Sequence, residues 1–244
     1  MISKKNPQNQ YNALQNKKYN DEELNNLKYE EAKKIDKRTF FQYYYSLLKK
    51  KHLILFTFLP TDDYNLTTVK ISLFLLSFSL YFTVNGFFFT DETMNQINKD
   101  KGEFNIIFQI PQILYSTIIS SVINIILRYL SLSEKQMLSI KSQDDYRKAE
   151  IEAKNIKKCI NIKLVLFFII SFLLMLFFWY YISSFCAVYQ NTQIILIGDT
   201  LLSFGLSMIY PFGLNLLPAT CRIIALRKKG KKCLYFISRC LAII

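Results

Sequence analysis

Histidine, glycine and proline are scarce in this chain of 244 residues. The single histidine, His52, excludes any site that needs two histidines, and with it most histidine-rich metal centres. Six glycines and five prolines exclude glycine-rich phosphate-binding loops spread over several segments. The spacings typical of nucleotide-binding loops, serine-hydrolase elbows and zinc proteases do not occur in the sequence. An enzyme is therefore the least supported class, and we expect neither a metal nor a cofactor.

Long apolar runs are what the sequence has in abundance. Apolar residues make up 51% of the chain, with 21 Phe and 16 Tyr among them. A helix that crosses a hydrocarbon core of about 30 Å needs about 20 such residues in succession. Runs of about that length occupy residues 71–89, 106–127, 164–181 and 200–220. We predict an all-α polytopic membrane protein, a four-helix transmembrane bundle with flanking amphipathic helices.

Basic residues exceed acidic ones and give the chain a formal charge of +13. Lys and Arg in short loops are retained on the cytoplasmic side of a membrane. If the four runs alternate in direction, 29 of the 31 basic residues fall on one side, and the loop 90–105 on the other side is net acidic. We predict cytoplasmic N- and C-termini. Because the charges follow membrane sides instead of one soluble surface, we expect no nucleic-acid binding.

Composition divides the chain into four segments. Residues 1–38 form a polar cytoplasmic segment, and residues 39–69 form an interfacial segment whose apolar stretches are too short to span. Residues 70–226 form the transmembrane domain, with a cytoplasmic connector at 128–163 that we expect to be a solvated helix. Residues 227–244 form a basic amphipathic tail.

Capping and charge patterns refine the flanking segments. Asn20 followed by Glu23 predicts the start of an amphipathic helix over 20–36. In the tail, a basic run predicts binding to anionic lipids of the cytoplasmic leaflet through Arg227, Lys228, Lys229, Lys231 and Lys232. The five cysteines are odd in number and irregularly spaced, which predicts reduced thiols. Palmitoylation is the alternative for those near the membrane.

A polar stripe follows the second apolar run. Its members recur every three or four positions, which places them on one side of a helix: Gln109, Gln112, Ser116, Ser120, Asn124 and Arg128. Lipid excludes such a face, so we expect it to contact protein or water. The pattern is typical of helices that pack through interhelical hydrogen bonds. A hydrophilic pathway, with a hinge at Pro111, is the alternative.

Asp199 is the acidic residue next to the fourth run. Together with Gly198 and Thr200 it favours an N-cap that opens the fourth helix at the outer surface. The alternative is an ion or proton site inside the membrane.

Two short sequence motifs resemble those of a known family. They are Asn85-Gly86-Phe87-Phe88 at the end of the first run and Leu201-Leu202-Ser203-Phe204 in the fourth. With the order of helices, they make the region from about Tyr43 to Leu226 resemble the internal transmembrane block of receptor-type polycystins. The chain is also similar to the C-terminal membrane regions of protist surface proteins. The resemblance implies a scaffold or accessory subunit of a plasma or ciliary membrane.

The sequence as a whole predicts a non-enzymatic, multi-pass integral membrane protein. We expect it to act as a scaffold or accessory subunit that binds other membrane protein subunits, or further copies of itself, through the polar face of the second helix. The alternative is a small ion channel or transporter that uses the same face, with Asp199 at its outer mouth.

Overall fold

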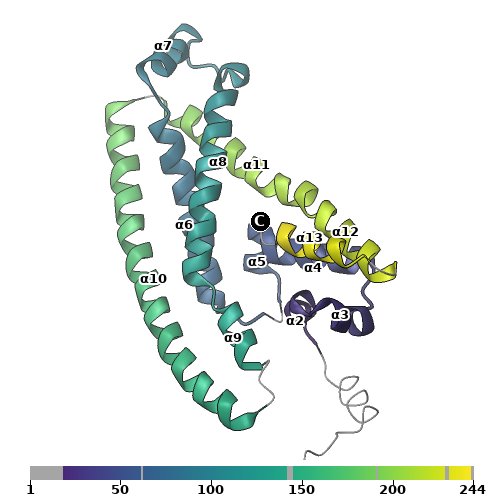
Figure 1. Ribbon diagram of the computed structural model, residues 1–244. Coiled ribbons are helices and arrows are strands. Elements are labelled where there is room, and N and C mark those ends of the chain that lie inside the picture. The colour runs from purple at the N-terminus through teal and green to yellow at the C-terminus, as the bar shows by residue number, and fades with distance from the viewer. Residues whose placement is uncertain (1–18, 62, 142–144, 191, 229–230, 243–244) are drawn as a thin grey trace, which may run out of the picture. The chain divides into compact units, whose positions relative to one another are not determined.

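The computed structural model describes residues 19–61, 63–141, 145–190, 192–228 and 231–242. Every regular element in this part of the chain is a helix, which confirms the predicted all-α class (Figure 1). Of the predicted segment 1–38, the first 18 residues lie outside the described part. The helices are α2 (Asp21–Asn26), α3 (Tyr29–Ile35), α4 (Phe40–Lys51), α5 (Leu53–Phe58), α6 (Thr67–Phe87), α7 (Asp91–Lys99), α8 (Ile106–Ser131), α9 (Glu134–Lys141), α10 (Tyr146–Val188), α11 (Gln193–Leu214), α12 (Leu216–Arg227) and α13 (Lys232–Leu241).

Four helical stretches are long and apolar enough to cross a membrane, as the sequence predicts. They are α6, α8, α10, and α11 with α12. Three of them contain a whole predicted apolar run, whereas α6 ends at Phe87, two residues before the end of the run 71–89. Helices α10 and α11 start well before the run they contain. In α10 the helix begins at Tyr146, so much of the predicted connector is one continuous helix with the third run. The reason is local: residues 146–163 contain no Gly or Pro and are rich in good helix formers.

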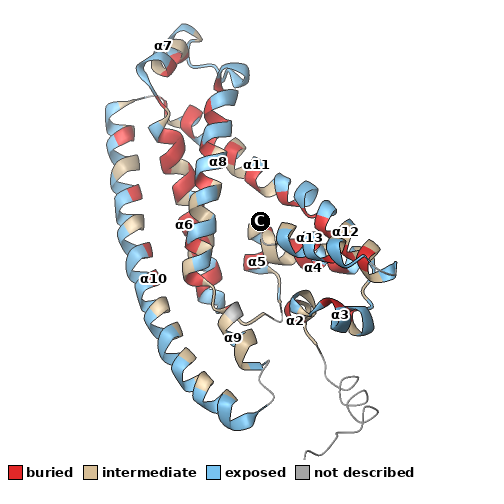
Figure 2. Cartoon of the chain, in the orientation of Figure 1, coloured by how far each residue is buried: buried red, intermediate tan, exposed pale blue. Residues whose placement is uncertain are grey.

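The described chain forms two compact units. Unit 2 consists of residues 56–58 and 64–211, and therefore contains α6 to α10 and most of α11. Its main core joins α6 to α8 and α10, where Leu73, Leu76 and Phe167 are almost fully buried. Figure 2 shows burial concentrated on α6, whereas most of the surface of α10 is exposed. An exposed apolar face of this kind is what lipid would cover.

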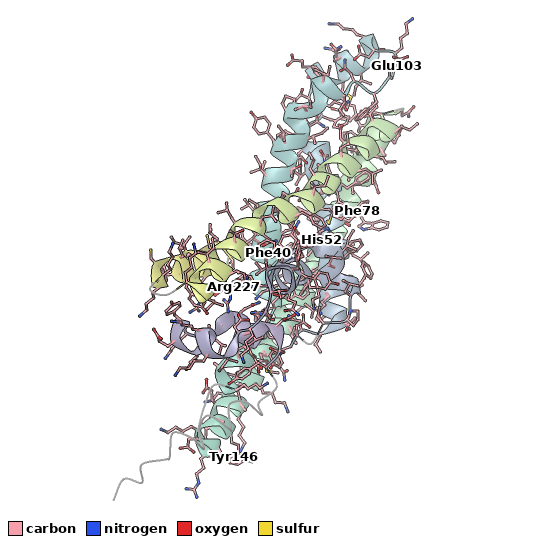
Figure 3. The ribbon with its side chains drawn as sticks, turned by 90° about the vertical axis from the view of Figure 1, so that its right-hand side faces the viewer. Phe40, His52, Phe78, Glu103, Tyr146 and Arg227 are labelled. Atoms are coloured by element: carbon pink, nitrogen blue, oxygen red, sulfur yellow. The ribbon has the colours of Figure 1, made fainter. Side chains whose placement is uncertain are left out.

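The predicted loop 90–105 contains a helix that the sequence analysis did not predict. Thr90 caps α7, because its hydroxyl accepts a hydrogen bond from the Thr93 N–H at 3.3 Å. Ile97 of α7 joins a second apolar cluster with Phe89, Phe185, Ile195 and Leu196. In Figure 3, Glu103, which follows α7, and Tyr146, which begins α10, lie at opposite ends of unit 2.

Unit 1 consists of residues up to 55, residues 59–63 and residues from 212 onward. The predicted capping pair is confirmed, since Asn20 and Glu23 each accept a hydrogen bond from the backbone N–H of the other, at 2.9 and 3.0 Å. The single helix predicted over 20–36 is wrong, because the chain forms α2 and α3 with a break after Asn26. Carbonyl groups at this break accept hydrogen bonds from Arg222 and Tyr235, which stabilise the interruption.

A buried ion pair lies at the centre of unit 1. The Asp36 carboxylate accepts hydrogen bonds from Arg222 and from Arg38, both at 2.8 Å. The Arg222 guanidinium lies 4.8 Å from the Tyr43 ring centroid and 4.9 Å from that of Tyr235. Burial of Asp36 opposes its ionisation, but the hydrogen bonds and charges of the two arginines outweigh burial and hold its pKa below the ordinary value.

Most of the predicted interfacial segment 39–69 lies in unit 1, as does the described part of the tail, whereas residues 56–58 and 64–69 belong to unit 2. In α4, which continues through Lys49–Lys51, Tyr43 and Leu47 are buried next to Ala219 of α12. His52 caps α5, since its Nδ1 accepts from the Leu55 N–H at 3.5 Å, and burial lowers the pKa of His52. The tail forms α13, which buries Tyr235 and Ser238 and leaves Phe236 exposed. Contact of these helices with a membrane surface stays a prediction.

Candidate functional site

The polar stripe of α8 faces the interior of unit 2. Gln109, Gln112, Ser116 and Ser120 are buried, and Asn124 is half-buried. Half-buried Arg128 ends the stripe. This face, which we expect to contact protein or water, contacts groups from α6 and α11 of the same chain. In this arrangement the four buried members of the stripe offer no surface to a partner subunit.

Asp199 lies inside a helix, so its prediction as an N-cap is wrong. Helix α11 begins at Gln193, and Asp199 occupies its second turn. The helix starts early because Ile195 and Leu196 pack against Phe89 and Phe185, which makes an additional turn favourable. With a rise of about 1.5 Å per residue, Asp199 is about 9 Å along the helix from its first residue.

One hydrogen bond holds the Asp199 side chain, which is fully buried. Gln112 Nε2 of α8 donates to Asp199 Oδ2 at 3.0 Å. The other carboxylate oxygen, Oδ1, has no hydrogen-bond partner. Among the residues that the structure describes, no Lys or Arg forms an ion pair with Asp199. The carboxyl group therefore lies between the packed helices of unit 2. Among the described residues it has one neutral hydrogen-bond donor and no compensating charge.

A second set of hydrogen bonds joins α6 to α11 one helical turn further along. Asn85 Nδ2 donates to Ser203 Oγ at 2.7 Å and to the Tyr81 carbonyl at 2.8 Å. Thr117 Oγ1 of α8 donates to the Ser203 carbonyl at 3.4 Å. Residues one turn apart on a helix point to the same side, so Asp199 and Ser203 present adjacent levels of one polar cluster.

Polar side chains continue toward the far end of α8. Tyr81 and Ser121 share a hydrogen bond of 3.1 Å, and Ser77 donates to Asn124 Oδ1 at 2.6 Å. At the end of the stripe, the Arg128 guanidinium lies 4.6 Å from the Phe56 ring centroid, and Lys70 Nζ lies 4.9 Å from the same ring. Hydrogen-bonding groups thus recur along α6 and α8 from Asp199 to the basic end of unit 2.

Several buried oxygens of this cluster have no hydrogen-bond partner. They are Asn85 Oδ1, Gln109 Oε1, Ser116 Oγ, Ser120 Oγ and Asp199 Oδ1. An unpaired buried polar group typically costs about 1–3 kcal/mol, so native proteins rarely leave several together. Three of these atoms, on Asn85, Gln109 and Asp199, can only accept when Asp199 is ionised, whereas the Ser116 and Ser120 hydroxyls can also donate. A species that supplies hydrogen-bond donors or positive charge would satisfy the three oxygens that only accept.

Aromatic side chains border the cluster. The Phe204 ring centroid, next to Ser203, lies 5.4 Å from that of Phe78 and 5.5 Å from that of Tyr81. Near Asp199, a Cβ atom added to Gly198 would lie 2.9 Å from Phe104 Cε2, so a larger residue at this position would require the Phe104 ring to move.

Sequence reasoning found the α8 half of this site and missed its α6 half. In the sequence, Asn85 is noted only as part of the short motif that resembles polycystins. An Asn inside an apolar run is, however, itself a signal of an interhelical hydrogen bond. The basic residues predicted to meet lipid are exposed at Arg227, Lys228, Lys231 and Lys232, and Lys229 lies outside the described residues. Within the part of the chain that the structure describes, no three His, Cys, Asp or Glu side chains gather in a metal-ligand group, and the cysteines form no disulfide.

Comparison with known proteins found no relative of this chain. It matches no protein-family model, no curated protein and no solved structure. The resemblance to the transmembrane block of polycystins stays a prediction.

Proposed function

We propose that this chain is a multi-pass integral membrane protein that conducts or transports a proton or a small cation along the polar cluster between α6, α8 and α11. Asp199 is the charged group of this path, and Gln112 orients it. Four helices of membrane-spanning length and apolar character support insertion in a bilayer. The observation that carries the proposal is the fully buried Asp199 carboxyl group, for which the described residues supply no ion-pair partner.

Helix packing alone does not account for an aspartate at this position. An asparagine would accept the same hydrogen bond from Gln112 without a buried charge, and insertion of Asp costs most, about 2.5–3.5 kcal/mol, at a helix centre. Acidic residues that face the interior of a bundle mark proton relays and ion pathways. The polar groups that follow at Ser203, Tyr81 and Asn124 provide further positions along the path at which the proton or cation can be hydrogen-bonded or bound.

Transport by the reconstituted full chain tests the proposal. In proteoliposomes with an imposed ion or pH gradient, Asp199→Asn is expected to reduce flux at least about tenfold, because the amide keeps the hydrogen bond to Gln112 but removes the charge. Asp199→Glu, which keeps the charge, should retain part of the flux. The matched control is Ser171→Ala, since Ser171 is also buried with an unpaired hydroxyl but lies on α10. Full flux in Asp199→Asn would contradict the proposal.

The proposed orientation places both termini in the cytoplasm and α7 outside. In cells, the natural sequon Asn65-Leu66-Thr67 should then remain unglycosylated, whereas a sequon introduced near Lys101 in the loop after α7 should acquire a glycan. A mobility shift on gel electrophoresis, reversed by an endoglycosidase, measures both. A glycan at Asn65 together with none near Lys101 would show that the topology is the reverse of the proposed one.

A role as a membrane anchor or accessory subunit is the second candidate function. It is favoured by α10, whose first part, residues 146–163, is charged and exposed and continues without a break into an apolar span. This charged part, unlike the buried stripe of α8, is available to an aqueous partner. Replacing residues 146–157 by a neutral helical sequence should abolish co-purification of such a partner while leaving transport in liposomes unchanged. Unchanged co-purification would remove this candidate.

A further inference from the structure

We propose that a basic recess of unit 1, between α3 and α12, binds the phosphate monoester of a membrane lipid headgroup. The recess has a volume of about 100 Å³ and is lined by four basic residues, one acidic residue and two apolar ones. A site of this kind requires insertion of the chain in a bilayer, but it does not require transport through unit 2.

Packing of α3 on α12 fixes the two sides of the recess. Tyr29 and Ala32 of α3 share an apolar cluster with Ala225 of α12, and the Tyr29 hydroxyl donates to the Ala225 carbonyl at 3.4 Å. Ile223 and Arg227, which both line the recess, are four positions apart on α12 and therefore lie on the same side of that helix. The recess thus combines apolar and basic groups on a packed pair of helices.

Arg38 lines the recess without a free hydrogen-bond donor. A guanidinium has five N–H groups, and those of Arg38 make five hydrogen bonds within unit 1. The acceptors are Asp36, Asp21, Ser46 and Asn25. The Asp36 carboxylate, which also lines the recess, is paired with Arg222 in addition to Arg38. Its negative charge is therefore compensated within the protein and opposes a bound anion only weakly.

Three other basic side chains of the recess are available to a ligand. Lys33, Lys37 and Arg227 are exposed, and within the described part of the chain no acidic side chain forms an ion pair with any of them. A phosphate monoester carries a charge of about −1.5 to −2 at pH 7 and three strong acceptor oxygens. It can therefore accept hydrogen bonds from all three side chains and neutralise most of their charge.

The size and position of the recess favour a lipid headgroup over a soluble phosphate compound. Pockets that enclose a whole small-molecule ligand have volumes of about 300–1,000 Å³, so this recess holds a single group of its ligand. Ile223 and Leu226 line it next to the basic groups and offer contacts to the apolar part of a lipid. Arg227 is the last residue of the fourth stretch of membrane-spanning character, so in a bilayer the recess would lie at headgroup depth.

Binding of short-chain lipids to the purified full-length protein in a neutral detergent tests the proposal. Dioctanoyl phosphatidic acid, which presents a phosphate monoester, should bind saturably at about 0.15 M salt, whereas dioctanoyl phosphatidylcholine should not. Lys33→Gln and Arg227→Gln should each raise the Kd for phosphatidic acid at least about tenfold, because each removes a charge-assisted hydrogen bond to the phosphate. Isothermal titration calorimetry measures the Kd values.

Each of these two variants has a matched control next to it in the chain. Lys34 and Lys228 are exposed like Lys33 and Arg227, but they do not line the recess. Lys34→Gln and Lys228→Gln remove the same charge and should change the Kd less than about twofold, because salt screens charges that do not contact the ligand. All four side chains are exposed, so the melting temperature should stay unchanged and report that every variant is folded.

Three results would overturn the proposal. They are absence of saturable binding of phosphatidic acid, an equal loss of affinity in the variants and their controls, and an affinity for inorganic phosphate equal to that for the lipid. The last result would assign the recess to a soluble phosphate compound instead of a lipid. Asp199→Asn should bind phosphatidic acid like the parent chain, because Asp199 belongs to unit 2. Failure of lipid binding is therefore distinguishable from failure of transport.

Discussion

Asp36→Ala is expected to destabilise unit 1 by about 3–5 kcal/mol, one of the two largest effects of a single substitution in this chain. The substitution leaves the guanidinium of Arg222, whose side chain is 1% exposed, without its carboxylate partner. Arg38 loses the same partner but retains Asp21 and Asn25. An unpaired buried charge costs far more than the pair contributes, and this asymmetry sets the size of the effect. Thermal unfolding of the protein in detergent measures it.

Asp21→Ala is the matched control for Asp36→Ala. Asp21 pairs with Arg38 and Lys49, but its side chain is 46% exposed, so its loss should cost no more than about 1 kcal/mol. The double variant Asp36→Leu with Arg222→Met removes both charges and should recover most of the stability. Equal destabilisation by Asp36→Ala and Asp21→Ala would show that the loss of stability does not come from the buried ion pair.

The same pair predicts how unit 1 responds to acid. The pKa of Asp36 is lowered in the folded protein, so its stabilising contribution is present above the pKa of the unfolded chain and is lost as the pH falls through the folded value. The difference in melting temperature between the parent chain and Asp36→Ala should therefore be large at neutral pH. It should shrink below about pH 4.

Phe167→Ala is expected to loosen α10 from unit 2, at a cost of about 3–5 kcal/mol. Phe167 is fully buried against the core formed with Leu73 and Leu76 of α6. In lipid, packing of side chains supplies most of the association between helices, so a cavity at this position removes contacts that lipid cannot replace. Chemical denaturation in mild detergent measures the loss.

The neighbouring Phe168 provides the control for Phe167→Ala. Phe168 is 38% exposed, so Phe168→Ala removes a ring of the same size without creating an enclosed cavity. We expect a cost of less than about 1 kcal/mol. If both substitutions destabilised the protein equally, α10 would not be held by the face that contains Phe167.

The parts of this fold that depend on one segment could be predicted from the sequence. The four apolar runs predict four long helices because a helix satisfies its own backbone hydrogen bonds. The capping box at Asn20 and the polar stripe of α8 depend on spacing within a few residues, and both are as predicted.

The parts that depend on distant pairs could not be predicted in the same way. Asp199 has the local pattern of an N-cap. The helix nevertheless begins earlier, at Gln193, because Ile195 and Leu196 pack on Phe89 and Phe185. The break between α2 and α3 depends on Arg222 and Tyr235, which lie 198 and 208 residues from their partners in the sequence. Asn85 contacts Ser203 across 118 positions, so the pattern of one helix can indicate an interhelical hydrogen bond at Asn85 but cannot identify its partner.

The length of α10 has a mechanical consequence. With 43 residues it is about 65 Å long, roughly twice the thickness of a hydrocarbon core. The charged end that begins at Tyr146 therefore extends beyond the apolar part as a lever of about 30 Å. A tilt of the apolar part by about 10° would displace that end by about 5 Å, a movement large enough to alter contacts with a neighbouring molecule. Small rearrangements among the spanning helices would thus be amplified outside the bilayer.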